Sequence, residues 1–150
     1  MNYYARALEL KEETVGHRRW FHQHAEVGLS MPQGQAYVLT ELKKLDIRAK
    51  ACGHGVSATL GKPGKCILLR ADMDALPMKE ESGLPFACTT GTAAHCCGHD
   101  FHAAMLLTAA KMLKEQQDTL EGTVKFMFQP GEETLEGARD MLQSGILQNP

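Results

Sequence analysis

The stretch "CILLRADMD", residues 66–74, joins a run of apolar residues to two carboxylates. A continuous apolar run is typical of a strand covered on both faces, as in the parallel sheets of α/β proteins. Acids that directly follow such a strand lie at the carboxyl edge of the sheet, where open α/β folds bind their ligands. Asp72 and Asp74 are therefore candidate site residues, with the capping of a turn as the alternative.

The hydrophobic periodicity on either side of this strand predicts an alternation of helices and strands. A helix near residue 30 would begin with Ser30 as its N-cap and Pro32 in its first turn. In chain order we expect a helix at residues 3–25, a second helix at 30–46, two or three strands within 47–69 and a long loop at 77–94. A third helix at 103–117, a strand at 122–129 and a last helix at 134–147 follow. This order predicts an α/β domain with a mostly parallel sheet flanked by helices.

The composition narrows the class of protein. The chain has 150 residues, 43% of them hydrophobic, which is enough for one domain with a core. Its net charge is −2, and its lysines and arginines are scattered, so we expect no nucleic-acid or membrane partner and a small neutral or anionic substrate. The first 20 residues lack an apolar signal region, and five cysteines are an odd number, so we expect a soluble cytoplasmic protein without a disulfide framework.

The segment "AAHCCGHDFH", residues 93–102, concentrates two cysteines, three histidines and an aspartate. It fits a metal site, a thiol nucleophile with its base, or a polar run that opens a helix. The side chains of Cys97 and His99 can face the same way, and the glycine between them leaves room for close approach. A thiolate and an imidazole suit Zn²⁺ and similar transition ions.

Two adjacent acids, Glu132 and Glu133, follow the apolar strand "VKFMF" and add carboxylates to the same predicted edge. Neighbouring glutamates do not easily face one ion together, so we expect one to bind metal and the other to transfer protons. A purely structural alternative is that both favour the start of a helix. A cysteine nucleophile would not account for these acids. His95 and His102 could support the site, contact the substrate or simply begin a helix; His17, His22, His24 and His54 are expected at the surface or behind the site.

Three separated motifs resemble one family: "LLRADMDALPM" at 68–78, "HCCGHDFH" at 95–102 and "FQPGEE" at 128–133. The segment "RRWFHQHAEVGL" also looks like the opening helix of that family, with Ala25 where a proline is commoner. The family is that of the metal-dependent amidohydrolases of metallopeptidase family twenty, subfamily D, which includes aminoacylases, hippurate hydrolases and indole-acetyl-amino-acid hydrolases. The resemblance implies the N-terminal part of a zinc-peptidase-like catalytic domain.

The resemblance also implies site roles. Cys97 would be a thiolate that bridges two divalent ions, zinc or manganese with cobalt or nickel as alternatives, and His99 and Glu133 would be further ligands. Glu132 would be the general base, and Asp74 would support the site from behind. The implied reaction is hydrolysis of the amide bond in an N-acyl amino acid.

Relatives supply two further histidine ligands and insert a dimerisation domain between them, whereas no histidine follows His102 here. We therefore expect residues 1–150 to be the N-terminal part of the catalytic domain, without the inserted domain and the C-terminal part. A homo-oligomer is compatible with the full-length protein. The alternative function is a truncated, inactive fragment that binds metal weakly or acts as an interaction module.

Overall fold

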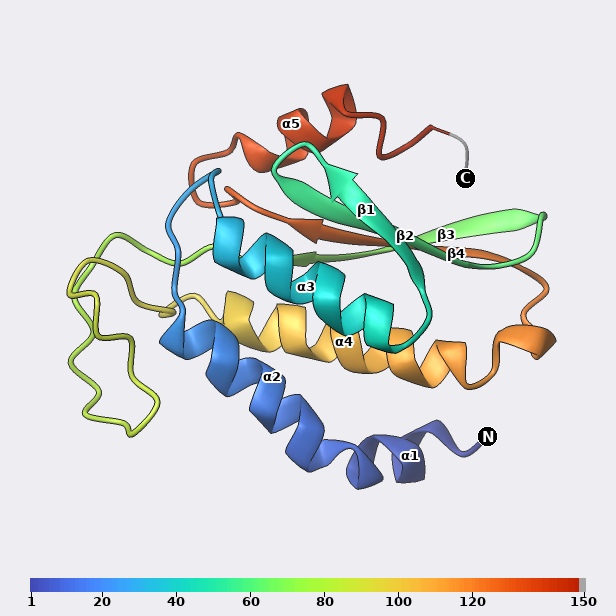
Figure 1. The fold of residues 1–150 in the computed structure, drawn as a ribbon, viewed down its shortest axis with the longest axis horizontal. Coiled ribbons are helices and arrows are strands. Elements are labelled where there is room, and N and C mark those ends of the chain that lie inside the picture. The colour runs from blue at the N-terminus through green and yellow to red at the C-terminus, as the bar shows by residue number, and fades with distance from the viewer. Residues whose placement is uncertain (149–150) are drawn as a thin grey trace.

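The computed structural model describes residues 1–148 as a sheet with helices on both faces (Figure 1). The elements in chain order are α1 (Tyr3–Glu9), α2 (Lys11–Gln23), α3 (Pro32–Lys44), β1 (Arg48–Cys52), β2 (Gly55–Gly61), β3 (Lys65–Asp72), α4 (His99–Lys114), a short 3-10 helix η1 (Gln117–Thr119), β4 (Gly122–Gln129) and α5 (Gly137–Gln143). The α/β class and the flanking helices are confirmed. No helix in residues 1–148 has the length and apolar content needed to cross a bilayer.

The sheet is mixed, with the strand order β1-β2-β4-β3. The prediction of a mostly parallel sheet is wrong for the described strands, because β1 with β2 and β2 with β4 are antiparallel and only β3 with β4 is parallel. The physical reason is the turn at Gly53 and His54, which is too short for a crossover and closes a hairpin. The parallel pair is joined through α4, as crossover geometry requires.

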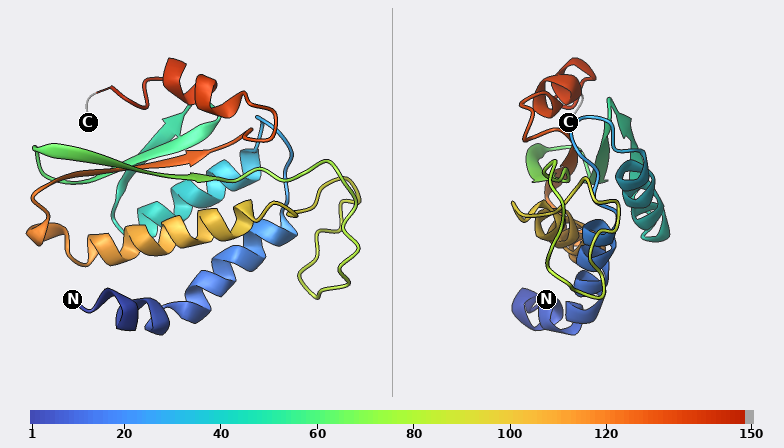
Figure 2. Two further views of the ribbon diagram at one scale, coloured as in Figure 1. Left: turned by 180° about the vertical axis from the view of Figure 1, so that it is seen from behind. Right: turned by 90° about the vertical axis from the view of Figure 1, so that its left-hand side faces the viewer.

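Alternation along β4 builds two apolar layers. Phe126 and Phe128 are fully buried in the main core with Val38 and Leu42 of α3, whereas Met127 packs in a second cluster with Met141 of α5. Successive strand residues point to opposite faces of the sheet, so this central strand packs against helices on both faces. Figure 2 shows α5 on one face of the sheet and the other long helices on the opposite face.

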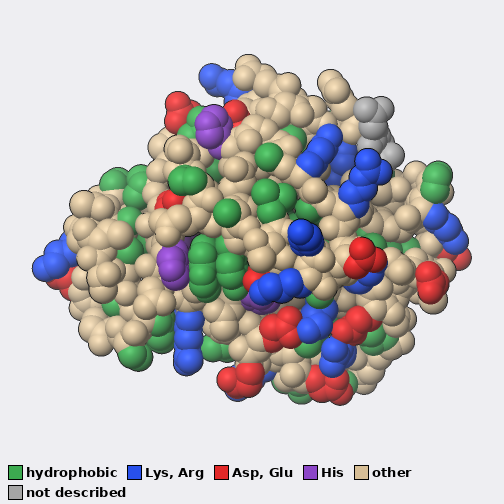
Figure 3. Space-filling view, in the orientation of Figure 1, with side chains coloured by type: hydrophobic (Ala, Val, Ile, Leu, Met, Phe, Trp, Pro, Cys, Tyr) green, Lys and Arg blue, Asp and Glu red, His purple; other side chains and the backbone are tan. Residues whose placement is uncertain are grey.

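The expected double coverage of "CILL" in β3 is wrong. Cys66 is exposed, and Ile67 and Leu68 are 63% and 37% exposed, because β3 is an edge strand of the described sheet. On the face seen in Figure 3, acidic and basic side chains are interspersed over the helical layer.

The start of α3 also differs from the prediction. Ser30 is not its N-cap; the carboxylate of Glu26 accepts hydrogen bonds from the backbone N–H groups of Gln33 and Gly34, at 3.2 and 2.8 Å. A longer side chain from outside the helix thus satisfies its first donors. The predicted long loop is confirmed: residues 77–98 contain no helix and no regular strand and connect β3 to α4.

Candidate metal centre

The carboxyl ends of β3 and β4 place four acids beside one another. The two strands run parallel, with Asp72 paired with Gln129, so both strands end at the same edge of the sheet (Figure 1). Asp72 is the last residue of β3 and Asp74 comes two residues later, while Glu132 and Glu133 come shortly after the end of β4. The backbone N–H of Glu133 donates to Asp74 Oδ2 at 3.1 Å, which joins the two strand exits directly.

The start of α4 brings a thiol and an imidazole to the same edge. Gly98 is the N-cap of α4 with φ +87°, a left-handed conformation that favours glycine, and it lies between Cys97 and His99. This turn lets the side chains before and after it face the carboxylates. The ligand atoms of Cys97, His99 and Glu133 all lie within 4.8 Å of one another.

The orientation of His99 presents its Nε2 atom to the acids. Its Nδ1 lies 2.8 Å from the backbone carbonyl of Asp74, which can only accept, so Nδ1 donates to that carbonyl. His99 Nε2 is 3.8 Å from an oxygen of each of Asp72, Glu132 and Glu133, too far for a direct hydrogen bond. A divalent cation between Nε2 and these oxygens would contact all of them.

Two buried oxygens strengthen this interpretation. Asp74 Oδ1 and Glu133 Oε1 have no hydrogen-bond partner among the described residues, although both are shielded from solvent. Unpartnered buried acceptors are costly unless a donor or a metal ion meets them. The set of sulfur, nitrogen and oxygen donors fits Zn²⁺ or a similar divalent ion.

The surroundings of Cys97 and Asp72 shift the pKa values of these two side chains. A hydrogen bond to Glu133, burial, and the negative charges of Glu133, Glu132 and Asp72 raise the pKa of the Cys97 thiol. Burial would raise the pKa of Asp72, but its hydrogen bond with His102 and the nearby positive groups outweigh burial and lower it. Without a metal ion, the thiol is therefore held in its protonated form.

A second group of possible ligands shares His99. Atoms of Asp72, His99 and His102 also lie within 4.8 Å of one another, and His102 Nδ1 is 2.6 Å from Asp72 Oδ1. Arg70 Nη1 lies 2.9 Å from the other oxygen of Asp72. From the sequence alone, Asp72 is either a turn cap or a site residue. The three-residue spacing of His99 and His102, which places both on one helix face, is the sequence feature that indicates a second ligand group here.

The remaining residues of the cysteine and histidine segment fall outside both groups. His95 is buried, and burial together with neighbouring positive groups lowers its pKa to about 4, so its ring is neutral. Cys96 is exposed and belongs to neither group of possible ligands. His17 and His22, expected at the surface or behind the site, are buried on α2.

Comparison with known sequences agrees with this geometry. The sequence model of the peptidase family M20/M25/M40 matches residues 68–150, which include all the acids, the thiol and the imidazole described above. The chain belongs to this peptidase family. The match covers the second part of β3, the long loop, α4, β4 and α5, the elements that bring the candidate ligands together.

Curated relatives of this M20/M25/M40 chain are longer than it is. It is 42% identical over 142 residues to an N-acetyl-L-cysteine deacetylase of Bacillus subtilis, covering 92% of this chain and 34% of that protein. It is 40% identical over 139 residues to the IAA-amino acid hydrolase ILR1-like 5 of Arabidopsis thaliana, covering 90% of this chain and 32% of that protein. The chain thus spans about a third of the length of the curated relatives that it matches.

Two solved structures share the fold of this chain. The YXEP protein of Bacillus subtilis, described as a dinuclear metal-binding peptidase from the M20 family, superposes with a TM-score of 0.87 at 36% identity, covering 91% of this chain and 40% of that one. A putative aminohydrolase of methicillin-resistant Staphylococcus aureus gives a TM-score of 0.92 at 34% identity, covering 99% and 40%.

Proposed function

We propose that these residues are the N-terminal part of the catalytic domain of a metal-dependent amidohydrolase that cleaves the amide bond of N-acyl amino acids. The observation that carries this proposal is the convergence of Cys97, His99 and Glu133 within 4.8 Å, with a carboxylate oxygen of Glu132 3.8 Å from His99 Nε2. Membership of the M20/M25/M40 peptidase family supports a hydrolytic reaction.

The candidate site residues have different roles in this proposal. Cys97, His99 and Glu133 would hold two divalent ions, zinc or manganese with cobalt or nickel as alternatives. Such ions supply Lewis acidity that polarises the amide carbonyl and activates water. Glu132, whose side chain is 38% exposed, would take the proton from the attacking water and deliver it to the departing amine.

Asp74 would act behind the ligands. Its carbonyl fixes the tautomer of His99, and its carboxylate accepts from the backbone N–H of Glu133, so it orients two ligands at once. The substrate class follows from the relatives, whose names include an N-acetyl-L-cysteine deacetylase and an N-acyl-L-amino acid amidohydrolase. We place the protein in the cytoplasm on the strength of its odd number of cysteines, and a homo-oligomer is compatible with the longer polypeptide.

Replacement of Glu132 tests the assignment of the base. We expect Glu132→Ala, made in the longest natural form of the protein, to keep its metal content and lose turnover of N-acetyl and N-benzoyl amino acids by at least about a hundredfold, as loss of a general base does. Metal analysis and release of the free amino acid are the measurements. Glu136→Ala is the matched control, because Glu136 is an exposed acid of the same segment. Full turnover in Glu132→Ala would refute the assignment.

A second candidate is favoured by the coverage of relatives, of which this chain spans about a third. In this alternative the 150-residue chain is an inactive fragment that binds metal weakly or acts as an interaction module. Metal titration and an activity assay on the same purified chain separate the two. Weak binding of an ion without turnover favours the fragment, and stoichiometric binding of two ions with turnover contradicts it.

A further inference from the structure

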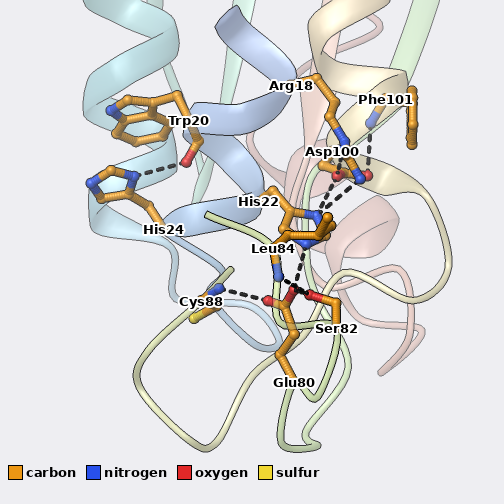
Figure 4. Close-up of polar contacts among 10 residues, drawn as sticks. All are labelled: Arg18, Trp20, His22, His24, Glu80, Ser82, Leu84, Cys88, Asp100 and Phe101. Carbon is orange, nitrogen blue, oxygen red and sulfur yellow. Dashed lines mark hydrogen bonds and ion pairs between the residues drawn. The ribbon is translucent and has the colours of Figure 1, made fainter. Parts of the chain in front are cut away.

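A largely buried network of four ionisable side chains lies beside the candidate metal centre without belonging to it. Arg18 and His22 come from α2, Asp100 from the first turn of α4, and Glu80 from the long loop at 77–98 (Figure 4). We name these four residues the loop-anchor network. Asp100 directly follows the candidate ligand His99, so the network meets the metal centre at the start of α4.

The contacts of the network are short and continuous. Asp100 Oδ2 accepts from Arg18 Nε at 2.8 Å and lies 2.7 Å from His22 Nδ1. Asp100 Oδ1 accepts from the backbone N–H of Phe101 at 2.9 Å. On its other side, His22 Nε2 lies 2.9 Å from Glu80 Oε1. Both ring nitrogens of His22 therefore face a carboxylate oxygen.

Further contacts hold the ring and the two carboxylates in this arrangement. Arg18 Nη2 also lies 3.3 Å from His22 Nδ1, so the guanidinium contacts both the ring and Asp100. Burial would raise the pKa of Glu80, but its hydrogen bonds with Ser82, with the backbone of Cys88 and with His22 outweigh burial and lower it. The His22 ring thus lies between one carboxylate from the loop and one from α4.

Glu80 connects this ring to the loop. Its Oε2 accepts from the backbone N–H of Cys88 at 2.6 Å, which ties two distant parts of the loop together. The same loop continues into Cys97, and its far end is held by the N-terminus of α4 through Gly98. One buried imidazole ring thus joins the loop to the helix, and Cys97 and His99 lie where the two meet.

We propose that His22 is a positioning residue whose ring ties the loop at 77–98 to the first turn of α4 and so holds Cys97 and His99 in place to bind metal. The consequence for metal binding rests on the proposed function. The charged groups that face the ring are Arg18, Asp100 and Glu80, and the neutral ring of His95 lies 6.1 Å away between centroids.

The first measurement is made without metal on the wild-type chain and on His22→Gln. Amide hydrogen exchange in residues 80–98 is expected to be faster in the variant, because the ring no longer joins Glu80 to Asp100. Equal exchange in the two chains would overturn the inference. This measurement does not depend on metal binding, so it is independent of the proposed function.

Three variants then test the positioning role. His22→Gln leaves one amide group between two carboxylates, so its oxygen faces an oxygen of Glu80 or Asp100. We expect faster amide exchange in residues 80–98 and a roughly tenfold loss of Zn²⁺ affinity by calorimetry, as for other residues that orient ligands. Glu80→Gln added to His22→Gln supplies an amide donor to that oxygen and should restore part of both properties. Glu80→Gln alone serves the same comparison if His22→Gln does not fold.

The matched control is His24→Gln. His24 lies on the same helix end but contacts the backbone of Trp20 at 2.8 Å and stacks on its ring, outside the network (Figure 4). Equal effects of His22→Gln and His24→Gln, or a loss that Glu80→Gln does not rescue, would overturn the positioning role. Unchanged Zn²⁺ affinity in Cys97→Ala would instead contradict the proposed function, while the loop exchange still tests this inference.

Discussion

Two buried polar clusters meet at adjacent residues, and they differ in how their charges are balanced. On the Asp100 side, the four side chains of the loop-anchor network are joined by contacts of 2.7 to 2.9 Å. On the His99 side, three carboxylates lie 3.8 Å from one ring nitrogen, and two buried oxygens have no partner in residues 1–148. The first cluster is complete within the chain and serves the fold. The second is complete only with a cation from outside.

The largest effect on stability is expected where the charges are already paired. Asp100→Ala removes the carboxylate between Arg18 and His22 and leaves both side chains without their shared partner. Loss of one partner of a buried pair costs about 3–5 kcal/mol. Urea unfolding in the presence of a chelator measures the change.

Asp100→Asn is the control for this prediction, because it keeps the shape of the side chain and an acceptor for the backbone N–H of Phe101. We expect it to be less damaging than alanine. A loss below about 1 kcal/mol in Asp100→Ala, the range of exposed ion pairs, would show that the network is not a stabilising unit.

The same contrast explains what the sequence could and could not predict. The meeting of Asp74, Glu133 and His99 was predictable, because each follows a strand or begins a helix and parallel strand ends share an edge. The pairing of His22 with Asp100 was not, since these residues are 78 positions apart and periodicity alone does not show which helix faces meet. The antiparallel hairpin and the exposed face of β3 were missed because an apolar run does not reveal its place in the sheet.

An intermediate effect is expected in the pH dependence of metal uptake. The hydrogen bond to Glu133 raises the pKa of the Cys97 thiol, so binding of an ion by the thiolate must release that proton. Below this raised pKa, Zn²⁺ affinity should increase by up to about tenfold per pH unit. Calorimetry between pH 7 and pH 8.5 in buffers of different ionisation enthalpy measures both the affinity and the proton release.

The variants Cys97→Ala and Cys66→Ala sharpen that prediction. Cys66 is also exposed, but it lies on β3 and in neither group of possible ligands. We expect the pH dependence to flatten in Cys97→Ala and to persist in Cys66→Ala. An equally steep dependence in both variants would exclude Cys97 as a ligand.

The smallest effect concerns the unpaired cluster without metal. Glu133→Gln removes one negative charge from a group that already contains Asp72, Asp74 and Glu132. The side chain is 24% exposed, so the gain in the free energy of unfolding should be only about 0.5 kcal/mol with chelator present. With Zn²⁺ in excess the sign should reverse, because the wild type gains binding free energy that the variant loses. Paired urea titrations with and without the ion measure this reversal. A loss of stability without metal would mean that Glu133 is held by partners in the fold, and the contrast between the two clusters would then be wrong.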